Sequence, residues 1–256
     1  MLSAEEVQTK ADEIRMNGYT LIPNVFPADK IAAMLEKFDP LLEAKRAREQ
    51  TNRGANRFQM HLPFEPPFAD PLLYENPDVL AITENLFGPD QILTYFASDT
   101  PFAGSDYQKV HIDCRLPFPE APYGVPTYSV VLNMALVDFT EENGPLELWP
   151  GATHMIAQPK DMERMATLIP SVRLLPKAGD LLLRDARSWH RGTPSHGSRS
   201  RPNLALVYSR GWFRFESSPY RIKIPRATYD AFSDRMKAIC RYCAILEPDG
   251  HISDAA

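Results

Sequence analysis

The chain has 256 residues, of which 44% are hydrophobic and 24% are charged, and this composition excludes a disordered or fibrous protein. Its formal net charge of -5 at pH 7 gives no sign of a broad surface for nucleic acid. With 24 prolines against 12 glycines, the composition favours short strands and stiff loops over a helical bundle.

Neither the start of the chain nor its cysteines indicate export or membrane insertion. Residues 1–18 carry acidic side chains and no apolar core, so they do not resemble a signal peptide. No run approaches the roughly 20 apolar residues that cross a bilayer. An odd, sparse set of three cysteines favours a reducing, cytoplasmic setting. Cys240 and Cys243 form a C-x-x-C without a second pair, which predicts two ordinary helix cysteines and no zinc site.

Residues 1–90 predict a mostly helical N-terminal layer. Ser3 and Glu6 have the spacing of a capping box, and the helix they open is expected to end at Gly18. Residues 19–26 predict a short strand, and apolar residues at helical spacing follow it up to Pro40, which is expected to break or kink that helix.

The rest of this layer predicts one long loop and one more helix. Residues 49–71 are polar and then proline-rich, as in an irregular loop that acts as a lid or binding segment. Asn76 and Pro77 open a helix that Gly88 closes.

From residue 91 the pattern becomes one of serial strands. Short apolar runs are separated by turn signals such as Glu142-Asn143-Gly144. The runs are ILTYFAS, YSVVLNMALV, LELW, VRLLP, DLLLRDA and NLALVYSRGW. Serial strands over about 91–215 predict a mainly β protein with flanking helices, a barrel or jelly roll and not alternating β-α units. A last helix is expected at about 226–243, and the simplest account is a single domain over 1–256.

A candidate metal site is carried by His111, Asp113 and His190. In a strand, residues i and i+2 project from the same face, so the imidazole of His111 and the carboxylate of Asp113 are expected side by side. His190 is a third ligand candidate in a later strand region. Two histidines and one carboxylate are the facial ligand set of non-haem Fe(II) oxygenases.

Zinc can take the same three ligands with one open position, so a second feature has to discriminate the two metals. Arg201 lies eleven residues after His190 and enters the strand NLALVYSR, where its guanidinium could pair with the far carboxylate of an organic dicarboxylate. A hydrolytic zinc site does not need such a residue. Arg199 and Arg210 compete with Arg201 for this role.

Several motifs together resemble the phytanoyl-CoA dioxygenase-like family of Fe(II)/2-oxoglutarate oxygenases. The matching segments are QKVHID (108–113), LPFPE (116–120), ENGPLELWPGATH (142–154), AGDLLLRDARSWHRGTP (178–194) and RPN (201–203). The combination of ENGPL with PG-x-x-H, W-H-R-G and the arginine is specific. His154 in the PG-x-x-H turn is expected to be a structural hydrogen-bonding residue and no fourth ligand.

The resemblance implies a double-stranded β-helix, the cupin-like jelly roll. By position it implies that His111, Asp113 and His190 bind Fe(II) and that Arg201 binds the distal carboxylate of 2-oxoglutarate. Further contacts to this cosubstrate fall at Asn133, Gln108 and Thr193. Relatives often have Asn or Ser soon after the last histidine, and here Thr193 stands in that region.

The resemblance also implies the reaction, in which O2 and 2-oxoglutarate are consumed, succinate and CO2 are released and a substrate C–H bond is hydroxylated. Halogenases of this class have a small residue in place of the aspartate, so Asp113 favours oxygenation. The expected substrate is a small or medium-sized, partly apolar metabolite with a polar handle, from natural-product biosynthesis or catabolism. The candidate substrate contacts are Arg57, Gln59, His61, Tyr95, Arg115, Arg210, Trp212 and Phe213.

Two other functions stay open from the sequence. One is a metal-dependent cupin hydrolase or isomerase that does not use 2-oxoglutarate, and the other is a catalytically silent jelly-roll binding protein. The expected partner is a small molecule, with no nucleic acid and no membrane, and both a monomer and a homodimer are compatible with the sequence.

Overall fold

The computed structural model describes residues 1–121, 124–151, 153–156, 161–214 and 220–255. The predicted end of the strand region, residue 215, and residue 152 of the PG-x-x-H turn lie outside these ranges. Helix α1 (Ala4–Asn17) has the predicted boundaries: the Glu6 N–H donates to the Ser3 hydroxyl at 3.2 Å, and the Ser3 N–H donates to the Glu6 carboxylate at 2.7 Å. Gly18 ends the helix in the left-handed conformation, at φ 83°.

Helix α2 (Ala28–Arg46) continues through Pro40, so the expected break does not occur. Pro40 is exposed, whereas Met34, Phe38 and Leu42 are buried along the opposite stripe of the helix. The missing proline N–H leaves one carbonyl without its helical partner, and the burial of this apolar stripe outweighs that loss.

The loop expected at 49–71 contains strand β2 (Arg57–His61), which pairs with β3. Asn52 holds the middle of this strand, because its side chain both accepts the Gln59 N–H at 2.7 Å and donates to the Gln59 carbonyl at 3.1 Å. The short helix α3 (Pro71–Tyr74) follows, and then α4 (Pro77–Phe87). Asn76 caps α4 and Gly88 ends it, as the sequence predicts.

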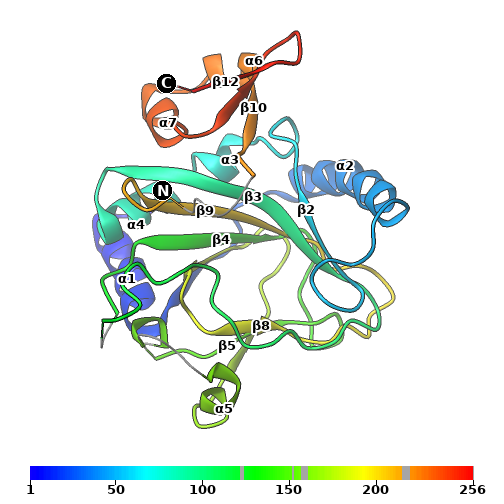
Figure 1. The fold of residues 1–256 in the computed structure, drawn as a ribbon, viewed down its shortest axis with the longest axis vertical. Helices are drawn as coiled ribbons and strands as arrows, with labels where there is room; N and C mark the ends of the chain where they lie inside the picture. Colours follow the sequence, from blue (N-terminus) through cyan, green and yellow to red (C-terminus); the bar gives the residue numbers. More distant parts are fainter. Residues whose placement is uncertain (122–123, 152, 157–160, 215–219, 256) are drawn as a thin grey trace.

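The core of the fold is a jelly roll made of one large and one small antiparallel sheet (Figure 1). The large sheet has the order β1, β7, β4, β9, β3, β2, and the small sheet has the order β6, β5, β8. The 3-10 helix η1 (Thr153–Met155) and helix α5 (Met162–Ala166) lie between β5 and β6 in the chain. The strand bounds are β1 Tyr19–Ile22, β3 Gln91–Pro101, β4 Ser129–Ala135, β5 Leu146–Leu148, β6 Val172–Leu174, β7 Leu181–Asp185, β8 His190–Gly192 and β9 Asn203–Arg210.

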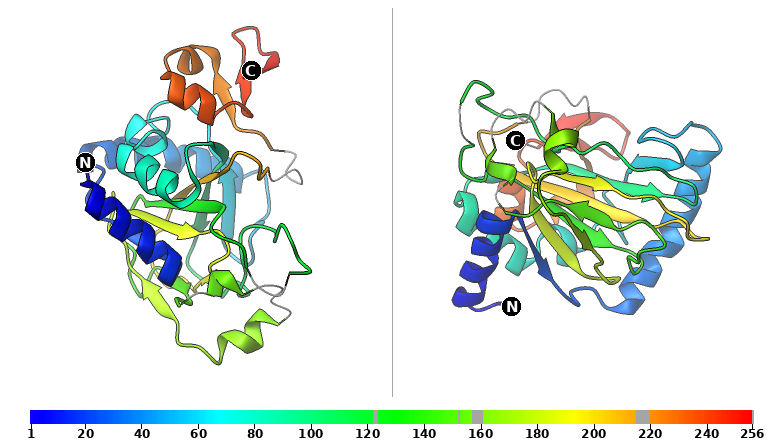
Figure 2. Two further views of the ribbon diagram at one scale, coloured as in Figure 1. Left: turned by 90° about the vertical axis from the view of Figure 1, so that its left-hand side faces the viewer. Right: turned by 90° about the horizontal axis from the view of Figure 1, so that it is seen from below.

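The two faces of the large sheet border different parts of the protein, because successive side chains in each strand point to opposite faces. In β4, Val130, Leu132 and Met134 belong to the main apolar core, which also includes buried residues of α1, α2 and α4. The alternating residues Val131 and Asn133 line an internal cavity. Helices α1 and α4 lie side by side on the core side of the sheet (Figure 2). The sheet therefore separates a helix-covered core from a cavity.

The C-terminal region differs from the single helix expected at 226–243, and that prediction is wrong. It forms β10 (Lys223–Pro225), α6 (Arg226–Asp230), α7 (Asp234–Ile239), β11 (Ala244–Leu246) and β12 (Ile252–Asp254), with the strands joined in a small sheet. This unit lies next to β3, at the top of Figure 1.

The helix is interrupted because two neighbouring residues have other partners. Phe232 is buried against Phe64 and Tyr74, and Ser233 caps α7 by accepting the Met236 N–H at 3.0 Å. Cys240 and Cys243 are free, buried thiols, but the prediction that both lie in a helix is wrong, because α7 ends at Ile239 and both residues follow it.

Within the described residues, no helix combines the length and the apolar character that a membrane span requires.

Candidate metal centre

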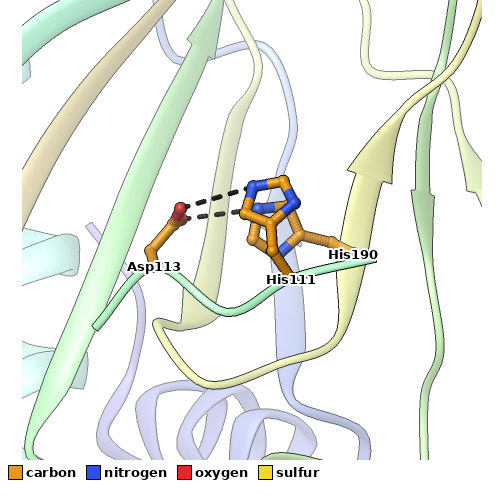
Figure 3. A group of neighbouring side chains, drawn as sticks. All are labelled: His111, Asp113 and His190. Carbon is orange, nitrogen blue, oxygen red and sulfur yellow. Dashed lines mark ion pairs between the residues drawn. The ribbon is translucent and has the colours of Figure 1, made fainter. Parts of the chain in front are cut away.

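Three side chains that are distant in sequence converge at one point. The Nε2 atom of His111 lies 3.8 Å from Oδ1 of Asp113, and the Nε2 atom of His190 lies 3.5 Å from Oδ2 of the same carboxylate. The three potential ligand atoms all lie within 4.8 Å of one another, and Figure 3 shows the carboxylate facing both rings. Two imidazole nitrogens and one carboxylate oxygen at this separation can bind one divalent transition-metal ion.

Backbone carbonyl groups orient both imidazole rings. Nδ1 of His111 donates to the Lys109 carbonyl at 2.8 Å, and Nδ1 of His190 donates to the Ser188 carbonyl at 2.9 Å. With Nδ1 protonated, each ring presents an unprotonated Nε2 to the cluster. This is the arrangement that metal-binding histidines need, because a hydrogen bond on one ring nitrogen fixes the tautomer at the other.

Backbone pairing holds the ligands together independently of any ion. His111 and His190 form an isolated antiparallel bridge, with N–H···O distances of 3.0 and 3.2 Å. The Asp113 N–H donates to the Ala186 carbonyl at 2.7 Å. Residues 111–113 therefore do not form a strand of their own but lie along β8 and the chain that leads into it.

A buried ion pair shapes the turn between β7 and β8. The two carboxylate oxygens of Asp185 accept from Nε and Nη2 of Arg187, at 2.9 and 2.8 Å, and both side chains are almost fully buried. Arg187 also donates to the Val125 carbonyl at 2.7 Å and lies over the Tyr128 ring. The turn that delivers His190 is thus fixed from inside the protein.

Arg184 is a further charged residue at the cluster. Its Nη2 donates to Oδ2 of Asp113, its Nε donates to Oδ1 of Asn133 at 3.1 Å, and its Nη1 lies 3.4 Å from Nδ1 of His190. The side chain is only 6% exposed. The cluster therefore contains a buried cation as well as its three potential ligands.

The surroundings keep Asp113 and His190 in the protonation states that bind a metal ion. Burial favours the neutral form of Asp113, but the Arg184 guanidinium and then the two histidines hold the pKa of this carboxyl well below its usual range. Burial, followed by the charge of Arg184, holds the pKa of His190 well below the ordinary value. An anionic aspartate and a neutral histidine are the forms that bind a metal ion.

The cluster opens into a cavity of about 450 Å³ between the two sheets. The side chain of Asp113 is 32% exposed because it faces this space. Apolar and hydroxyl-bearing side chains from β4 and β9, among them Val131, Ser129, Val207 and Ser209, form part of the wall. A cavity of this size, with a few convergent polar groups, is typical of a small-molecule site.

Arg201 reaches the same cavity from the chain that leads into β9. Its side chain is 3% exposed, its guanidinium carbon lies 4.0 Å above the Phe139 ring, and its Nε has no hydrogen-bond partner among the described residues. Burial, and then the charge of Arg57, lowers the pKa of Arg201 to about 9. A buried guanidinium with an unpaired donor is costly, and an anionic ligand in the cavity would offset that cost.

The structure brings about half of the other predicted site residues to the cavity. Gln108 lines it and accepts the Gly192 N–H at 2.9 Å through its side chain. Thr193 is buried, and its hydroxyl donates to the Pro145 carbonyl at 2.8 Å. Thr193 does not line the cavity. The other predicted residues that line the cavity are Asn133, Gln59, His61, Tyr95 and Phe213.

The remaining substrate candidates lie elsewhere. Arg57 is buried behind the cavity and pairs with Asp99 at 3.0 Å. Arg210 donates to the Thr127 and Leu86 carbonyls. Arg115 is exposed and Trp212 is 57% exposed, and neither lines the cavity.

Sequence reasoning did not single out Arg184, Arg53 or Phe139, and all three line the cavity. A signal for Arg184 was present in the sequence. It is a charged residue in the apolar run DLLLRDA, and the period of two puts it on the opposite face from Leu181 and Leu183. Arg53 and Phe139 come from connections, where no periodicity indicates the direction of a side chain.

Comparison with solved structures shows the same fold in two enzymes from nogalamycin biosynthesis and in HygX. The α-ketoglutarate-dependent epimerase SnoN of nogalamycin biosynthesis is 21% identical, with a TM-score of 0.59 over 80% of this chain and 83% of that chain. The carbocyclase SnoK of the same biosynthesis is 19% identical, with a TM-score of 0.61 over 81% and 84% of the two chains. HygX from Streptomyces hygroscopicus, solved with nickel and 2-oxoglutarate bound, is 17% identical, with a TM-score of 0.59 over 84% and 89%.

A family model matches most of the sequence. The model of phytanoyl-CoA dioxygenase (PhyH) covers residues 14–203, a range that begins in α1 and ends at the start of β9. The match includes all three residues of the metal-ligand cluster and Arg201. The chain therefore belongs to the phytanoyl-CoA dioxygenase family.

Proposed function

We propose that this chain is an Fe(II)/2-oxoglutarate-dependent dioxygenase that hydroxylates a C–H bond of a small or medium-sized metabolite. The observation that carries the proposal is the joint placement of the His111–Asp113–His190 cluster and the buried Arg201 guanidinium around one cavity. A metal site alone would suit many reactions. A metal site with a separate cation for a dicarboxylate suits 2-oxoglutarate.

The residues present fit both groups. The three ligands offer a mixed nitrogen and oxygen set that suits Fe(II) and leaves positions for a chelating cosubstrate. Arg201 supplies the guanidinium for the distal carboxylate of 2-oxoglutarate, and Gln108 and Asn133 lie on the wall of the same cavity. When bound, Fe(II) and 2-oxoglutarate supply the oxidising chemistry, in which O2 is consumed and succinate and CO2 are released.

The protein's own contribution is to orient the ligands and to surround the reacting groups. The carbonyl contacts of the two histidines hold Nε2 toward the ion, and the apolar wall around Val131 and Val207 limits the access of water. Asp113 occupies the position at which a small residue would open a site for halide, so we propose oxygenation and not halogenation.

The cavity wall supports a partly apolar substrate with a polar handle. Tyr95 and His61 lie edge to face, with ring centroids 5.6 Å apart, and His61 stacks on Tyr220. Gln59 contacts the Tyr95 hydroxyl and accepts from Nε of Arg53 at 2.8 Å. Aromatic faces beside a row of polar groups suit a ring-containing metabolite that carries hydroxyl or carbonyl groups. The nogalamycin enzymes with this fold support natural-product metabolism as the setting.

The test is substrate-stimulated turnover of 2-oxoglutarate. Protein purified without oxygen is loaded with Fe(II) and ascorbate, mixed with 2-oxoglutarate and a panel of metabolites in air, and assayed for succinate and for products 16 mass units heavier. We expect at least one metabolite to raise succinate formation above the background rate and to gain one oxygen atom. His190→Ala is the control that removes a metal ligand, and we expect it to abolish both signals.

The alternatives predict different results in the same experiment. A cupin hydrolase or isomerase would bind metal but would show neither 2-oxoglutarate binding nor succinate formation. A silent binding protein would bind neither the metal nor the cosubstrate at this cluster. If the wild-type protein with Fe(II) does not bind 2-oxoglutarate, the proposal is wrong.

A further inference from the structure

Arg184 is a charged residue that directly follows three leucines in a buried strand. Strand β7 reads Leu181-Leu182-Leu183-Arg184-Asp185 and is buried along its whole length. Leu181 and Leu183 pack into the helix-covered core, and Arg184, in register with Val131 on β4, lines the cavity. A long cation therefore lies on the cavity face of the large sheet, beside the metal-ligand cluster.

Burying this charge is expensive unless each of its donors has a suitable partner. Here the guanidinium is shared between two neighbours. One of its nitrogens bonds Oδ2 of Asp113, and another bonds Oδ1 of Asn133 at 3.1 Å. Oδ1 of Asp113 faces the His111 ring, with Nε2 3.8 Å away, and Oδ2, the oxygen that Arg184 contacts, lies 3.5 Å from Nε2 of His190. The contact with Arg184 therefore fixes the carboxylate in an orientation that turns one oxygen toward each imidazole.

We infer that Arg184 is a positioning residue for the metal ligand Asp113, holding its carboxylate so that it faces the two histidines and can bind the same ion. This rests on the proposed metal centre and adds to it a charged partner outside the ligand set. Arg184 does not touch the metal in this assignment, and it acts through the orientation of the carboxylate. Outer contacts of this kind typically change metal affinity 10–100-fold when they are removed.

Charge and geometry predict opposite changes in metal affinity when Arg184 is replaced. A cation beside the site repels a divalent ion, so by charge alone Arg184→Gln would bind metal more tightly. If Arg184 positions Asp113, the same variant binds metal more weakly, because the freed carboxylate turns away from the two histidines. The sign of the change distinguishes the two effects.

The experiment titrates Co(II), without 2-oxoglutarate, into wild-type protein, Arg184→Gln and Arg184→Lys, and follows the visible absorption of the bound ion. For Arg184→Gln we expect an affinity about 10–100-fold lower and an altered Co(II) spectrum, which reports the ligand geometry directly. Arg184→Lys keeps the charge but lacks the fork that reaches both neighbours, so we expect an intermediate affinity.

A control variant separates positioning from a general structural effect. Arg191→Gln removes another arginine–carboxylate pair, between Arg191 on β8 and Glu147 at 2.6 Å, and Arg191 does not line the cavity. We expect Arg191→Gln to bind Co(II) within threefold of wild type with an unchanged spectrum, and the melting temperature of each variant checks that it is folded.

Specific results would overturn the inference. Tighter or unchanged Co(II) binding by folded Arg184→Gln would show that the residue does not position Asp113, and so would an equal loss in Arg191→Gln. If Arg184→Gln does not fold, Arg184→Lys decides the matter, and wild-type affinity with a wild-type spectrum in that variant contradicts the inference. Failure of the wild-type protein itself to bind Co(II) would instead contradict the proposed metal centre.

Discussion

Two buried cations, Arg184 and Arg201, lie on the wall of one cavity, and their partners differ. Arg184 has a carboxylate and an amide oxygen within the protein, whereas Nε of Arg201 has no partner among the described residues. Unpaired buried donors are rare in folded proteins, and a bound water, ion or ligand is one explanation for them. At the scale of single residues, Arg201 is therefore the cation on this wall that has a donor left for a ligand.

Replacing Arg201 is expected to weaken the binding of 2-oxoglutarate. A hydrogen bond to a charged group contributes about 1.5–3 kcal/mol, so Arg201→Gln should raise the Kd of 2-oxoglutarate about 10–150-fold in the anaerobic Fe(II) protein, with metal affinity nearly unchanged. The Kd is measured from the charge-transfer absorption of the complex. Arg199→Gln is the matched control, because Arg199 does not line this cavity. Equal affinity in wild type and Arg201→Gln would contradict the role of Arg201.

His154 gives a prediction about pH. Its Nε2 donates to the Arg15 carbonyl at 3.1 Å, its Nδ1 has no partner among the described residues, and burial is the main cause that lowers its pKa from 6.5. The unfolded chain therefore takes up this proton at a higher pH than the folded protein, and the free energy of unfolding falls as the pH drops through about 6.5.

Removing that imidazole should weaken the pH dependence. Urea unfolding is compared at pH 7.5 and 5.5 for the wild-type protein and His154→Gln. We expect the variant to lose less stability over this interval, although it is less stable at both pH values because a buried contact is altered. The same loss in both proteins would show that His154 is not a source of the acid sensitivity.

At the scale of elements, the turn from β7 to β8 connects the position of Arg184 to that of His190. The Asp185–Arg187 pair holds this turn, with the carboxylate 0% and the guanidinium 2% exposed. Burial favours the neutral form of Asp185, but the hydrogen bonds and charge of Arg187 lower its pKa below the usual range. The turn thus depends on a charge pair that cannot lose one member without leaving the other buried and unpaired.

Breaking this pair should be strongly destabilising. Arg187→Leu is expected to lower the free energy of unfolding by about 3–5 kcal/mol, measured by urea denaturation, because it leaves the Asp185 carboxylate buried without a partner. Adding Asp185→Asn to Arg187→Leu removes the uncompensated charge and should restore part of the loss. If the double variant is the less stable of the two, the cost comes from lost packing and not from the isolated charge.

At the scale of the whole molecule, the cavity lies between the two sheets, and ligands bound in it stabilise the folded state only. Saturation to 100 times Kd contributes about 2.7 kcal/mol, which corresponds to a rise of roughly 5–10 °C in Tm for a chain of this size. We expect this rise in Tm on adding Mn(II) together with 2-oxoglutarate, measured by differential scanning fluorimetry. His190→Ala should show no rise, and an equal rise in that variant would place the binding site elsewhere.

The sequence predicted much of this architecture where local signals and tertiary structure agree. The capping box at Ser3, the turn at Gly88 and the serial apolar runs after residue 91 carry their own start and stop signals, and the structure follows them. The cluster of His111, Asp113 and His190 was predicted by combining side-chain chemistry with the family resemblance, and the structure brings these three together.

The sequence failed where tertiary packing decides. Helix α2 continues through Pro40 because its opposite face is buried, and the expected C-terminal helix is divided because Phe232 packs into the core. Arg57 and Arg115 were predicted as substrate contacts, but Arg57 pairs with Asp99, which lies diagonally across the ladder of β2 and β3, and Arg115 is exposed. Direction and burial of a side chain on a loop or an edge strand are not encoded in its neighbours along the chain.

The backbone bridge between His111 and His190 has one more consequence. Two main-chain hydrogen bonds already hold His111 and His190 together, and carbonyl groups already select the tautomers of their imidazoles. The loss of conformational entropy that assembling the coordination sphere requires therefore occurs when the polypeptide folds and not when the ion binds. We therefore expect the proposed metal centre to be preorganised without its ion. A chelator should remove the ion, and addition of fresh metal should restore it, with no cycle of denaturation and renaturation in between.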